Sequence, residues 1–269
     1  MPASPSTESL APADASAAND QPAWSEQDLA GEPHAQEDKP ARVNRMFAAI
    51  APKYDLNNRL HSFGRDQAWR RKAVETAAPR SGDVVLDVAC GTGDLTRLFA
   101  KSPASRVIGA DFCGAMLSVA SQKTAGKRFG GASIQYIEAD AMALPIADNS
   151  VDIVSIAFGI RNVATPATAI GEFARVLRPG GRLVILEFSE PRNPVIRQLN
   201  HVYCSRIMPR TATLISRDTS GAYHYLPRSI DTFLDRDELA QLMRDAGFTA
   251  ITQQSLTMGV CTCHRGIAT

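Results

Sequence analysis

From residue 82 onward, short apolar runs alternate with segments that carry the apolar spacing of amphipathic helices. This alternation is typical of a mostly parallel β-sheet covered by helices, because parallel neighbours need a long crossover between them. The chain has 269 residues, of which 44% are hydrophobic, so it can bury one substantial α/β core. The runs that we expect to form strands are Val84–Ala89, Arg106–Asp111, Ile134–Ala139, Asp152–Ala157 and Arg182–Phe188.

The pattern changes after the last of these runs. Residues 190–235 are polar, aromatic and irregular, and "DRDELAQLMRDAGF" then predicts a helix that begins near Asp235 and ends at Gly247. Two further strand-like runs, at 249–256 and 259–265, lie so close together that they must form a hairpin, which makes at least one of them antiparallel. The predicted fold is therefore α/β, a Rossmann-like, seven-stranded, mostly parallel sheet with an antiparallel C-terminal hairpin.

The N-terminal residues have a different composition. Residues 1–38 hold eight acidic residues and no Lys or Arg, in a background rich in Ala, Ser and Pro. Such a segment lacks the apolar content that folding requires. We therefore expect residues 1–40 to form a disordered acidic low-complexity tail, and deletion of residues 1–38 to change neither folding nor activity. The remaining chain, 41–269, is expected to form one domain with an N-terminal helical cap at 41–80 and a substrate-side insertion at 190–235.

The composition excludes several classes of protein. The longest apolar run, "VDIVSIAFGI", is far shorter than the roughly 20 residues that span a bilayer. The acidic start fits neither a secretory signal nor a mitochondrial transit peptide. Five cysteines without framework spacing favour a reducing cytoplasm. A net charge of +1, and basic residues without interleaved aromatic ones, argue against a nucleic-acid partner.

The stretch "VLDVACGTGDLT" reads as a buried strand, a glycine turn and the start of a helix. A dinucleotide fingerprint would need a third glycine where Thr96 stands. Asp94 lies in the first helical turn, where its charge would repel the phosphates that a helix N-terminus attracts. S-adenosylmethionine carries no phosphate and fits this turn better. The sheet and the turn together predict a class I S-adenosylmethionine-dependent methyltransferase.

The residues of the turn suggest how this cofactor would be held. Asp87, at the end of the first strand, is positioned to bind the ammonium group, directly or through water. Gly91, Thr92 and Gly93 allow the cofactor to approach the backbone closely. The alternative for Asp87 is a structural one, the capping of the next helix.

Two later strand ends complete the predicted cofactor site. Asp111 ends the second strand, where a carboxylate can accept hydrogen bonds from both ribose hydroxyls. Asp140 and Ala141 follow the third strand, where they would face the adenine amino group and ring. Each aspartate has a structural alternative, as a helix cap at Asp111 and as a turn residue at Asp140. Their occurrence at consecutive strand ends, on the edge where open α/β sheets bind ligands, favours the cofactor interpretation.

The chain also resembles a known family. The motifs that carry the resemblance are "KYDLNNRLHSFGRDQAWRRKAV", "VLDVACGTGDLT", "ADFCGAML", "EADAMALPIADNSVDIVSIAFGIRNV", "RVLRPGGRLVILEF" and "TMGVCTCHRG". Together they resemble the quinone-biosynthesis C-methyltransferases of the UbiE/MenG type, over about residues 42–266. The resemblance implies methylation of demethylmenaquinol, and in some members of a polyprenyl methoxybenzoquinol. It implies cofactor contacts at Thr92, Asp111, Asp140 and Ala141. Ala157 departs from the pattern, since some relatives have a cofactor-contacting serine there.

The chemistry implied by the resemblance indicates further residues. A quinol ring carbon becomes nucleophilic when an adjacent hydroxyl loses its proton. Arg161 and Asn162, just past the fourth strand, are positioned to hold the quinol oxygens, and a nearby arginine lowers the pKa of a phenol. The proton acceptor is left open among Tyr54, Asp55, His61 and a water bound to Arg161. For Arg161 the alternative is a structural ion pair.

A prenylated quinol substrate also implies contact with a membrane. We expect a cytoplasmic enzyme that associates transiently with the inner face of the cell membrane, and a homodimer is left open. Basic residues that would meet anionic lipid headgroups, or form a solvated helix face, are Arg65, Arg70, Arg71 and Lys72.

No metal site is expected, because "CTCHRG" lacks the spacing of a zinc site. The alternative functions are a phospholipid or other small-molecule methyltransferase, and a non-catalytic cofactor-binding scaffold of a quinone-synthesis complex.

Overall fold

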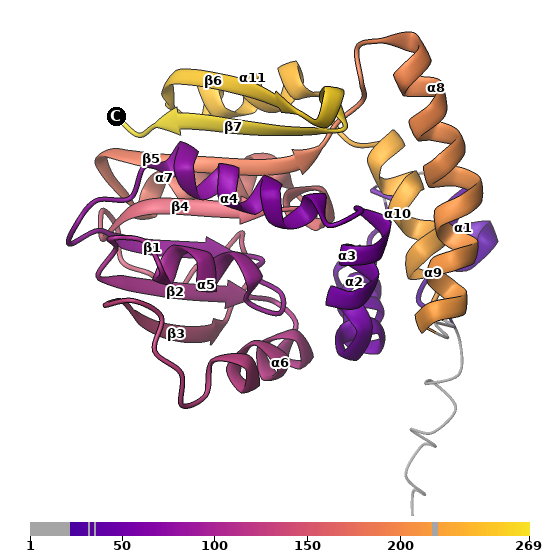
Figure 1. The fold of residues 1–269 in the computed structure, drawn as a ribbon. Coiled ribbons are helices and arrows are strands. Elements are labelled where there is room, and N and C mark those ends of the chain that lie inside the picture. The colour runs from indigo at the N-terminus through magenta and orange to yellow at the C-terminus, as the bar shows by residue number, and fades with distance from the viewer. Residues whose placement is uncertain (1–21, 32, 35, 217–219) are drawn as a thin grey trace, which may run out of the picture.

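The structure, a computed structural model, describes residues 22–31, 33–34, 36–216 and 220–269. One seven-stranded sheet organises these residues, in the order β3-β2-β1-β4-β5-β7-β6 (Figure 1). The first five strands in this order pair in parallel, and β7 is antiparallel to both of its neighbours. The strands are β1 (Val84–Val88), β2 (Arg106–Asp111), β3 (Ser133–Glu138), β4 (Val151–Ala157), β5 (Leu177–Phe188), β6 (Thr249–Leu256) and β7 (Cys261–Ile267). The predicted fold class is confirmed.

Helices cover both faces of the sheet. On one face, α4 and α5 bury Trp69 and Phe99 against β1 and β4. On the other face, α7 and α11 bury Phe173 and Met243. The helices are α1 (Glu26–Ala30), α2 (Lys39–Ile50), α3 (Tyr54–His61), α4 (Arg65–Ala77), α5 (Asp94–Ala100), α6 (Gly114–Thr124), α7 (Pro166–Val176), α8 (Pro194–Val202), α9 (Met208–Ser216), α10 (Ala222–Asp231) and α11 (Arg236–Asp245).

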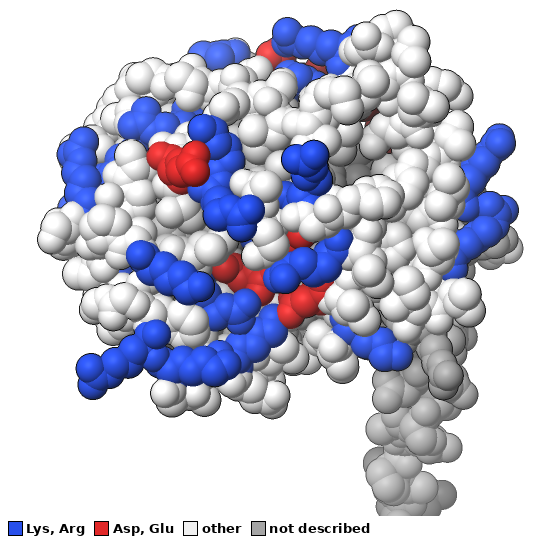
Figure 2. Space-filling model, in the orientation of Figure 1, with Lys and Arg blue, Asp and Glu red and all other residues white. Residues whose placement is uncertain are grey.

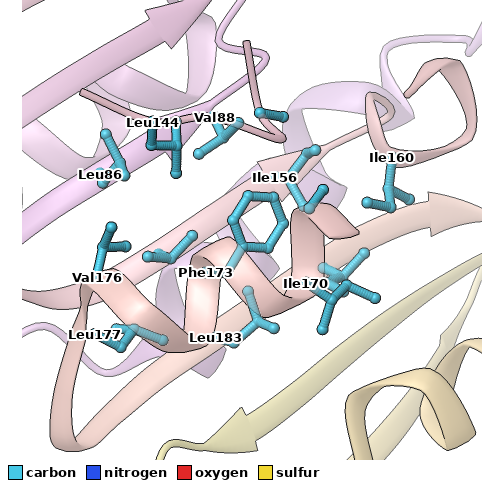
Figure 3. Packing of buried hydrophobic residues seen from close by; sticks show 14 of the residues in the cluster. Leu86, Val88, Leu144, Ile156, Ile160, Ile170, Phe173, Val176, Leu177 and Leu183 are labelled. Carbon is cyan, nitrogen blue, oxygen red and sulfur yellow. The ribbon is translucent and has the colours of Figure 1, made fainter. Parts of the chain in front are cut away.

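The core beneath α7 shows why this sheet reads as continuous apolar runs. Phe173 projects from α7 into the centre of a cluster that includes Leu86, Ile156 and Leu183 from three neighbouring strands (Figure 3). Strands covered on both faces have no polar side to alternate with. At about 25 cal/mol per Å² of buried apolar surface, each such side chain stabilises the fold by roughly 1.5 to 3 kcal/mol. The cluster therefore holds the strand ends in fixed relative positions.

A second group of helices lies beyond the carboxyl ends of the parallel strands. In Figure 1 this group, α2, α3 and α8–α10, stands to the right of the sheet. The predicted cap thus divides, because α2 and α3 belong to this group whereas α4 packs on a face of the sheet. Residues 190–235 are largely helical rather than irregular, with a π-helical turn at Tyr203–Ile207 between α8 and α9. The two helical segments together form a layer over the edge where the loops carry the predicted site.

The N-terminal segment departs from the expectation. The expected disordered tail, residues 1–40, includes a part that packs on the domain: Trp24 is 2% exposed and its ring stacks on that of Tyr225. Ser25 and Asp28 form a capping box at the start of α1. The expectation is therefore corrected for the described residues from 22 onward, because one aromatic ring and a capped turn anchor an otherwise polar segment. Residues 1–21 of the expected tail lie outside the described residues.

Candidate active site

The glycine turn after β1 bends the backbone around a carboxylate. Gly91, at a φ of +56°, donates its N–H to Asp111 Oδ2 at 2.7 Å. Cys113 donates its N–H to Asp111 Oδ1 at 2.9 Å. Burial raises the pKa of the Asp111 carboxyl, although these backbone N–H groups oppose the shift. Each oxygen keeps a further lone pair, so Asp111 can accept two more hydrogen bonds from a ligand.

Asp111 lines a cavity of about 840 Å³, counting the part open to solvent. Gly91 lies beside it, and Asp140 and Ala141 line the wall that follows β3. Ala157 lines the cavity too, as its position before "FGIRN" suggested. The remaining walls are largely apolar, including Val88 and Met142. Few polar groups on apolar walls are typical of a small-molecule site.

Asp87 lies behind this cavity and does not line it. Its side chain is buried, and its two oxygens accept hydrogen bonds from the hydroxyls of Thr96 (2.6 Å) and Ser155 (2.8 Å). Burial raises the pKa of Asp87 to about 6, although both hydroxyls oppose the shift. Thr96, which stands where a dinucleotide site needs glycine, therefore ties the helix α5 to the end of β1. Asp87 thus has a structural role, but not the helix cap considered as the alternative, because α5 begins after Gly93 without a side-chain cap.

Side chains from α3 and α6 fix the remaining residues of the glycine turn. Thr92 donates its hydroxyl to Asp55 Oδ1, and Lys123 from α6 forms an ion pair with the same carboxylate. Gly93 has a φ of +77°, and a Cβ there would lie 2.5 Å from the Tyr136 hydroxyl oxygen. Asp55 therefore holds the turn in place and lines neither this cavity nor the larger one described below.

Asp94 is the centre of a charge network beneath the turn. It accepts from Arg59 at 3.1 Å and is also paired with Arg97 and, at 3.7 Å, with Lys123. Burial opposes its ionisation, but the surrounding positive charges outweigh this, so the pKa of Asp94 is lowered. Asp94 thus stands at the N-terminus of α5 as a charged carboxylate surrounded by cations.

A larger cavity, of about 1980 Å³ including its open part, adjoins the first. Phe47, Tyr54 and Phe158 line both cavities, so these three rings lie at the boundary between them. Helices α3, α8, α9 and α10 contribute much of its wall. His61 lines this cavity, but its ring nitrogens are engaged by the Asn57 carbonyl (2.9 Å) and the Thr211 hydroxyl (2.8 Å).

Arg161 reaches the larger cavity from the turn after β4. Its Nη1 donates to the Phe158 carbonyl (2.7 Å) and to Glu187 Oε1 (2.8 Å), and its Nε donates to the Ser229 hydroxyl (3.3 Å). Among the described residues Nη2 has no hydrogen-bond partner in the structure. Asn162 lines the smaller cavity and accepts a hydrogen bond from the Tyr225 hydroxyl at 3.0 Å. The two residues thus occupy the walls of the two adjoining cavities, and Arg161 also has the structural ion pair weighed as the alternative.

Two functional neighbours of Arg161 were not indicated by the sequence patterns. Glu187 is buried at the end of β5; burial raises the pKa of its carboxyl, although Arg161 opposes the shift, and its Oε2 has no partner among the described residues. Phe158 has a φ of +59°, which turns its carbonyl to Arg161 and its ring to the boundary of the cavities. For Glu187, the single carboxylate inside the apolar run "LVILEF" was a sequence signal that could have indicated a buried functional group. For Phe158, no feature of the sequence predicts the strained backbone conformation.

The basic set on α4 does not form one continuous surface. Arg70 is 8% exposed and its guanidinium lies over the Phe158 ring, 5.3 Å from the centroid. Arg65 lines the larger cavity, and Lys72 pairs with Glu75. This arrangement separates the residues that were considered as a lipid-binding patch.

The C-terminal cysteines are structural. Cys261 and Cys263 are buried in β7, and His264 between β5 and β6 holds the Arg236 carbonyl at 2.9 Å through Nε2. In the part of the chain that the structure describes, no group of three or more His, Cys, Asp or Glu side chains is arranged to hold a metal ion.

Comparison with known proteins agrees with this geometry. Residues 35–268 match the ubiE/COQ5 methyltransferase family. The demethylmenaquinone methyltransferase of Thermus thermophilus is 45% identical over 222 residues, 82% of this chain and 99% of that protein. The ubiquinone/menaquinone biosynthesis C-methyltransferase UbiE of Shewanella pealeana is 40% identical over 232 residues, 86% of this chain and 92% of that protein. A solved S-adenosylmethionine-dependent methyltransferase from Aquifex aeolicus superimposes with a TM-score of 0.57 at 16% identity, covering 80% of this chain and 98% of that one, which establishes the fold.

Proposed function

Because the chain belongs to the ubiE/COQ5 methyltransferase family, we propose that it methylates a ring carbon of a prenylated quinol with S-adenosylmethionine as the methyl donor. The substrates we propose are demethylmenaquinol, and as a second one 2-methoxy-6-polyprenyl-1,4-benzoquinol. The observation that best supports this is the pair of adjoining cavities, which meet at Phe47, Tyr54 and Phe158. One is lined by strand-end carboxylates and the other is large and mostly apolar.

The residues of the smaller cavity fit S-adenosylmethionine. This cofactor supplies a methyl group carried on a positively charged sulfur. Asp111 has lone pairs free for the ribose hydroxyls, and the glycine at 91 leaves room for close backbone approach. Asp140 and Ala141 would face the adenine. Gly91, Thr92 and Gly93 shape the turn, while Asp87 supports it from behind.

The larger cavity fits the quinol. Phenols have a pKa of about 10, so the protein must favour the phenolate for the ring carbon to attack. The Nη2 group of Arg161 would bind the phenolate oxygen and lower its pKa, and Asn162 would orient the ring at the boundary. The aromatic rings at the boundary of the two cavities would keep the quinol ring aligned for the transfer. His61 and Asp55 are engaged elsewhere, which leaves Tyr54, at the boundary of the cavities, and water at Arg161. Of these two we propose that the water receives the proton.

Replacing Arg161 tests these roles. Arg161→Ala should leave the affinity for S-adenosylmethionine within about twofold and lower kcat by about 100-fold, the effect of removing one donor to a developing anion. Arg178→Ala, which removes an exposed ion pair with Asp152, is the matched control and should change neither quantity. A parallel fall of cofactor affinity and kcat in Arg161→Ala would place the residue in the cofactor site instead.

Quinone analysis in cells tests the reaction itself. A strain that lacks the gene should accumulate the unmethylated quinone, and the wild-type gene should restore the methylated form. Loss of methylated phospholipid with normal quinones would favour the alternative of a phospholipid methyltransferase. Restoration by a variant that no longer binds S-adenosylmethionine would favour the alternative of a non-catalytic scaffold, whereas restoration by Arg161→Ala would contradict only the role of Arg161.

We propose further that α8 and α9 rest on an anionic membrane surface. No helix in the described ranges is long and apolar enough to cross a membrane. Yet Val195 and Leu199 on α8 are each 64% exposed and Leu214 on α9 is 80% exposed. Residues 191–216 contain four arginines and no acidic residue. In Figure 2 basic side chains stand along the edge that α8 and α9 form, with uncharged residues between them. Exposed apolar residues beside basic ones are typical of helices that bind the membrane interface.

Sedimentation with lipid vesicles tests this surface. The protein should bind vesicles that contain phosphatidylglycerol. Arg206→Glu with Arg210→Glu should weaken binding by at least about 30-fold, because each basic residue contributes about 1 kcal/mol near such a surface and two are lost. The matched control, Lys101→Glu with Arg106→Glu, changes exposed residues at the opposite edge of the sheet and should bind normally. Equal binding by both double variants would contradict the assignment of this face.

A further inference from the structure

We infer that residues 22–31 and 33–34, here called the N-terminal strap, position Arg161 and Asn162 by bracing α10 against them. The inference rests on the proposed function, since it takes these two residues as the ones that hold the quinol. The strap precedes the residues that match the family, which begin at 35. It is therefore a feature that neither the glycine turn nor the family motifs account for.

Trp24 attaches the strap to the start of α10. Its ring lies 4.5 Å from that of Tyr225 between centroids, at an interplanar angle of 18°. Its backbone N–H donates to the Ser220 carbonyl at 3.1 Å. A Cβ at Gly221 would lie 2.3 Å from the Trp24 carbonyl oxygen, so the strap touches the backbone that opens the helix. Two stacked rings and a direct backbone contact fix the position of this part of α10.

The same helix carries the partners of both proposed quinol-binding residues. The Tyr225 hydroxyl donates to Asn162 Oδ1 at 3.0 Å. The Ser229 hydroxyl, one turn further, accepts from Arg161 Nε at 3.3 Å. Burial raises the pKa of Tyr225 to about 12, so the hydroxyl keeps its proton and remains a donor. A shift of α10 would therefore move both side chains at the cavity wall.

A second attachment acts at the other end of the strap. His34 Nε2 lies 3.0 Å from the Ser229 carbonyl, and its Nδ1 lies 3.1 Å from Lys39 Nζ. Lys39 is 2% exposed and donates to the carbonyls of Arg161 (3.1 Å) and Val163 (2.7 Å). The strap and the first residue of α2 thus hold the 3-10 turn Ile160–Asn162 from behind.

Charges hold the strap itself in place. Arg42 from α2 pairs with Asp28 at 2.8 Å, donates to the Ala23 carbonyl at 3.3 Å and lies over the Trp24 ring, 5.6 Å from its centroid. Trp24 lines neither cavity. The strap touches neither cavity, so its loss should act through α10. It should displace Arg161 at the larger cavity and Asn162 at one wall of the smaller cavity, and leave Asp111 with its backbone partners in place.

Two truncations that differ by three residues test the inference. The first deletes residues 1–21 and keeps Trp24, and the second deletes residues 1–24. Relative to the first, the second should lower kcat for the quinol by about 10- to 100-fold, since misplacement of a reacting group by about 1 Å costs that much. The dissociation constant of S-adenosylmethionine should stay within about twofold in both.

Point variants in the full chain separate positioning from folding. Trp24→Ala should reproduce the loss of kcat, whereas Trp24→Phe should restore most of it, because Phe keeps the stack on Tyr225 and omits an indole N–H that has no partner among the described residues. Amide hydrogen exchange at residues 159–163 should quicken in Trp24→Ala only. This exchange is measured without substrate, so it tests the strap independently of the quinol reaction.

Three results would overturn the inference. They are an equal kcat for the two truncations, a parallel loss of cofactor affinity and kcat in Trp24→Ala, and unchanged exchange at 159–163. If instead exchange quickens while Arg161→Ala keeps full activity, the strap is upheld as a brace of this turn and the proposed role of Arg161 fails. The two failures are thus distinguishable.

Discussion

Replacing Asp111 with Ala should weaken S-adenosylmethionine binding by two orders of magnitude or more. Its carboxylate already accepts the N–H groups of Gly91 and Cys113, and the remaining lone pairs face the smaller cavity. Two hydrogen bonds from the ribose to a charged acceptor are worth about 1.5 to 3 kcal/mol each. Their loss therefore corresponds to about 3 to 6 kcal/mol, or about a 10²- to 10⁴-fold rise in the dissociation constant.

Isothermal titration calorimetry on folded protein, checked by circular dichroism, measures this effect. Asp111→Asn keeps the shape and one acceptor but loses the charge, so it should fall between Ala and the wild type. Glu138→Gln is the matched control, because Glu138 is exposed and is the register neighbour of Asp111 on β3 but does not line the cavity. Unchanged affinity in a folded Asp111→Ala variant would remove this residue from the cofactor site.

Three further substitutions test the supports of the site. Gly93→Ala should destabilise the protein by about 1 to 3 kcal/mol, because its Cβ would lie 2.5 Å from the Tyr136 hydroxyl oxygen. Adding Tyr136→Phe should restore part of the lost melting temperature. If it restores none, the clash with the hydroxyl is not the cause. Asp87 has a folded pKa of about 6, above the unfolded value of 3.8, so the wild type loses stability as pH rises from 4 to 7. Urea unfolding should show Asp87→Asn gaining up to about 3 kcal/mol relative to the wild type over that range, and a constant difference would refute the shift. Glu187→Gln removes a negative charge that competes for Arg161, so the acidic limb of the kcat–pH profile should move to lower pH; an unmoved or raised limb would argue against this competition.

Much of the sheet follows from the sequence because its strands are buried on both faces. The predicted strands at Val84 and Arg106 begin where the structure has them, and the helix after Asp235 begins at its predicted cap. The fifth strand starts earlier than predicted, because Leu177 pairs with Val151 before the Pro-Gly-Gly turn interrupts the register. The pattern of apolar residues does not predict the pairing of Leu177 with Val151, because an irregularity in the register separates it from the rest of the β4–β5 pairing.

The helical layer over the strand ends was harder to predict. Helix α8 has no buried residue, so its apolar positions, Val195 and Leu199, do not mark a core face. Trp24 is one aromatic residue in an acidic segment, and tertiary contacts with Tyr225, Ser220 and Arg42 make it structural. The composition of a segment does not show that one aromatic residue in it packs on the domain. For this reason all of residues 1–40 were predicted to be a disordered tail.

Within the site, strand-end positions located Asp111, Asp140 and Ala141 at one cavity. The direction of a side chain was beyond the same reasoning. Asp55 and Asp87 are each close in sequence to residues that line the cavity. The Asp55 side chain nevertheless points to Lys123, and the Asp87 side chain points to Thr96 and Ser155. A carboxylate goes to the partners that best replace its lost hydration, and those partners come from distant parts of the chain.

The redox state of the accepted substrate tests the central claim most directly. An oxidised quinone has no hydroxyl proton to lose, so Arg161 would have no phenolate to stabilise and the ring carbon would not attack the methyl group. Purified protein with S-adenosylmethionine and a short-chain demethylmenaquinone should therefore form the methylated product, detected by mass spectrometry, only after reduction with dithionite or borohydride. Equal rates with the fully oxidised compound under air would contradict the account.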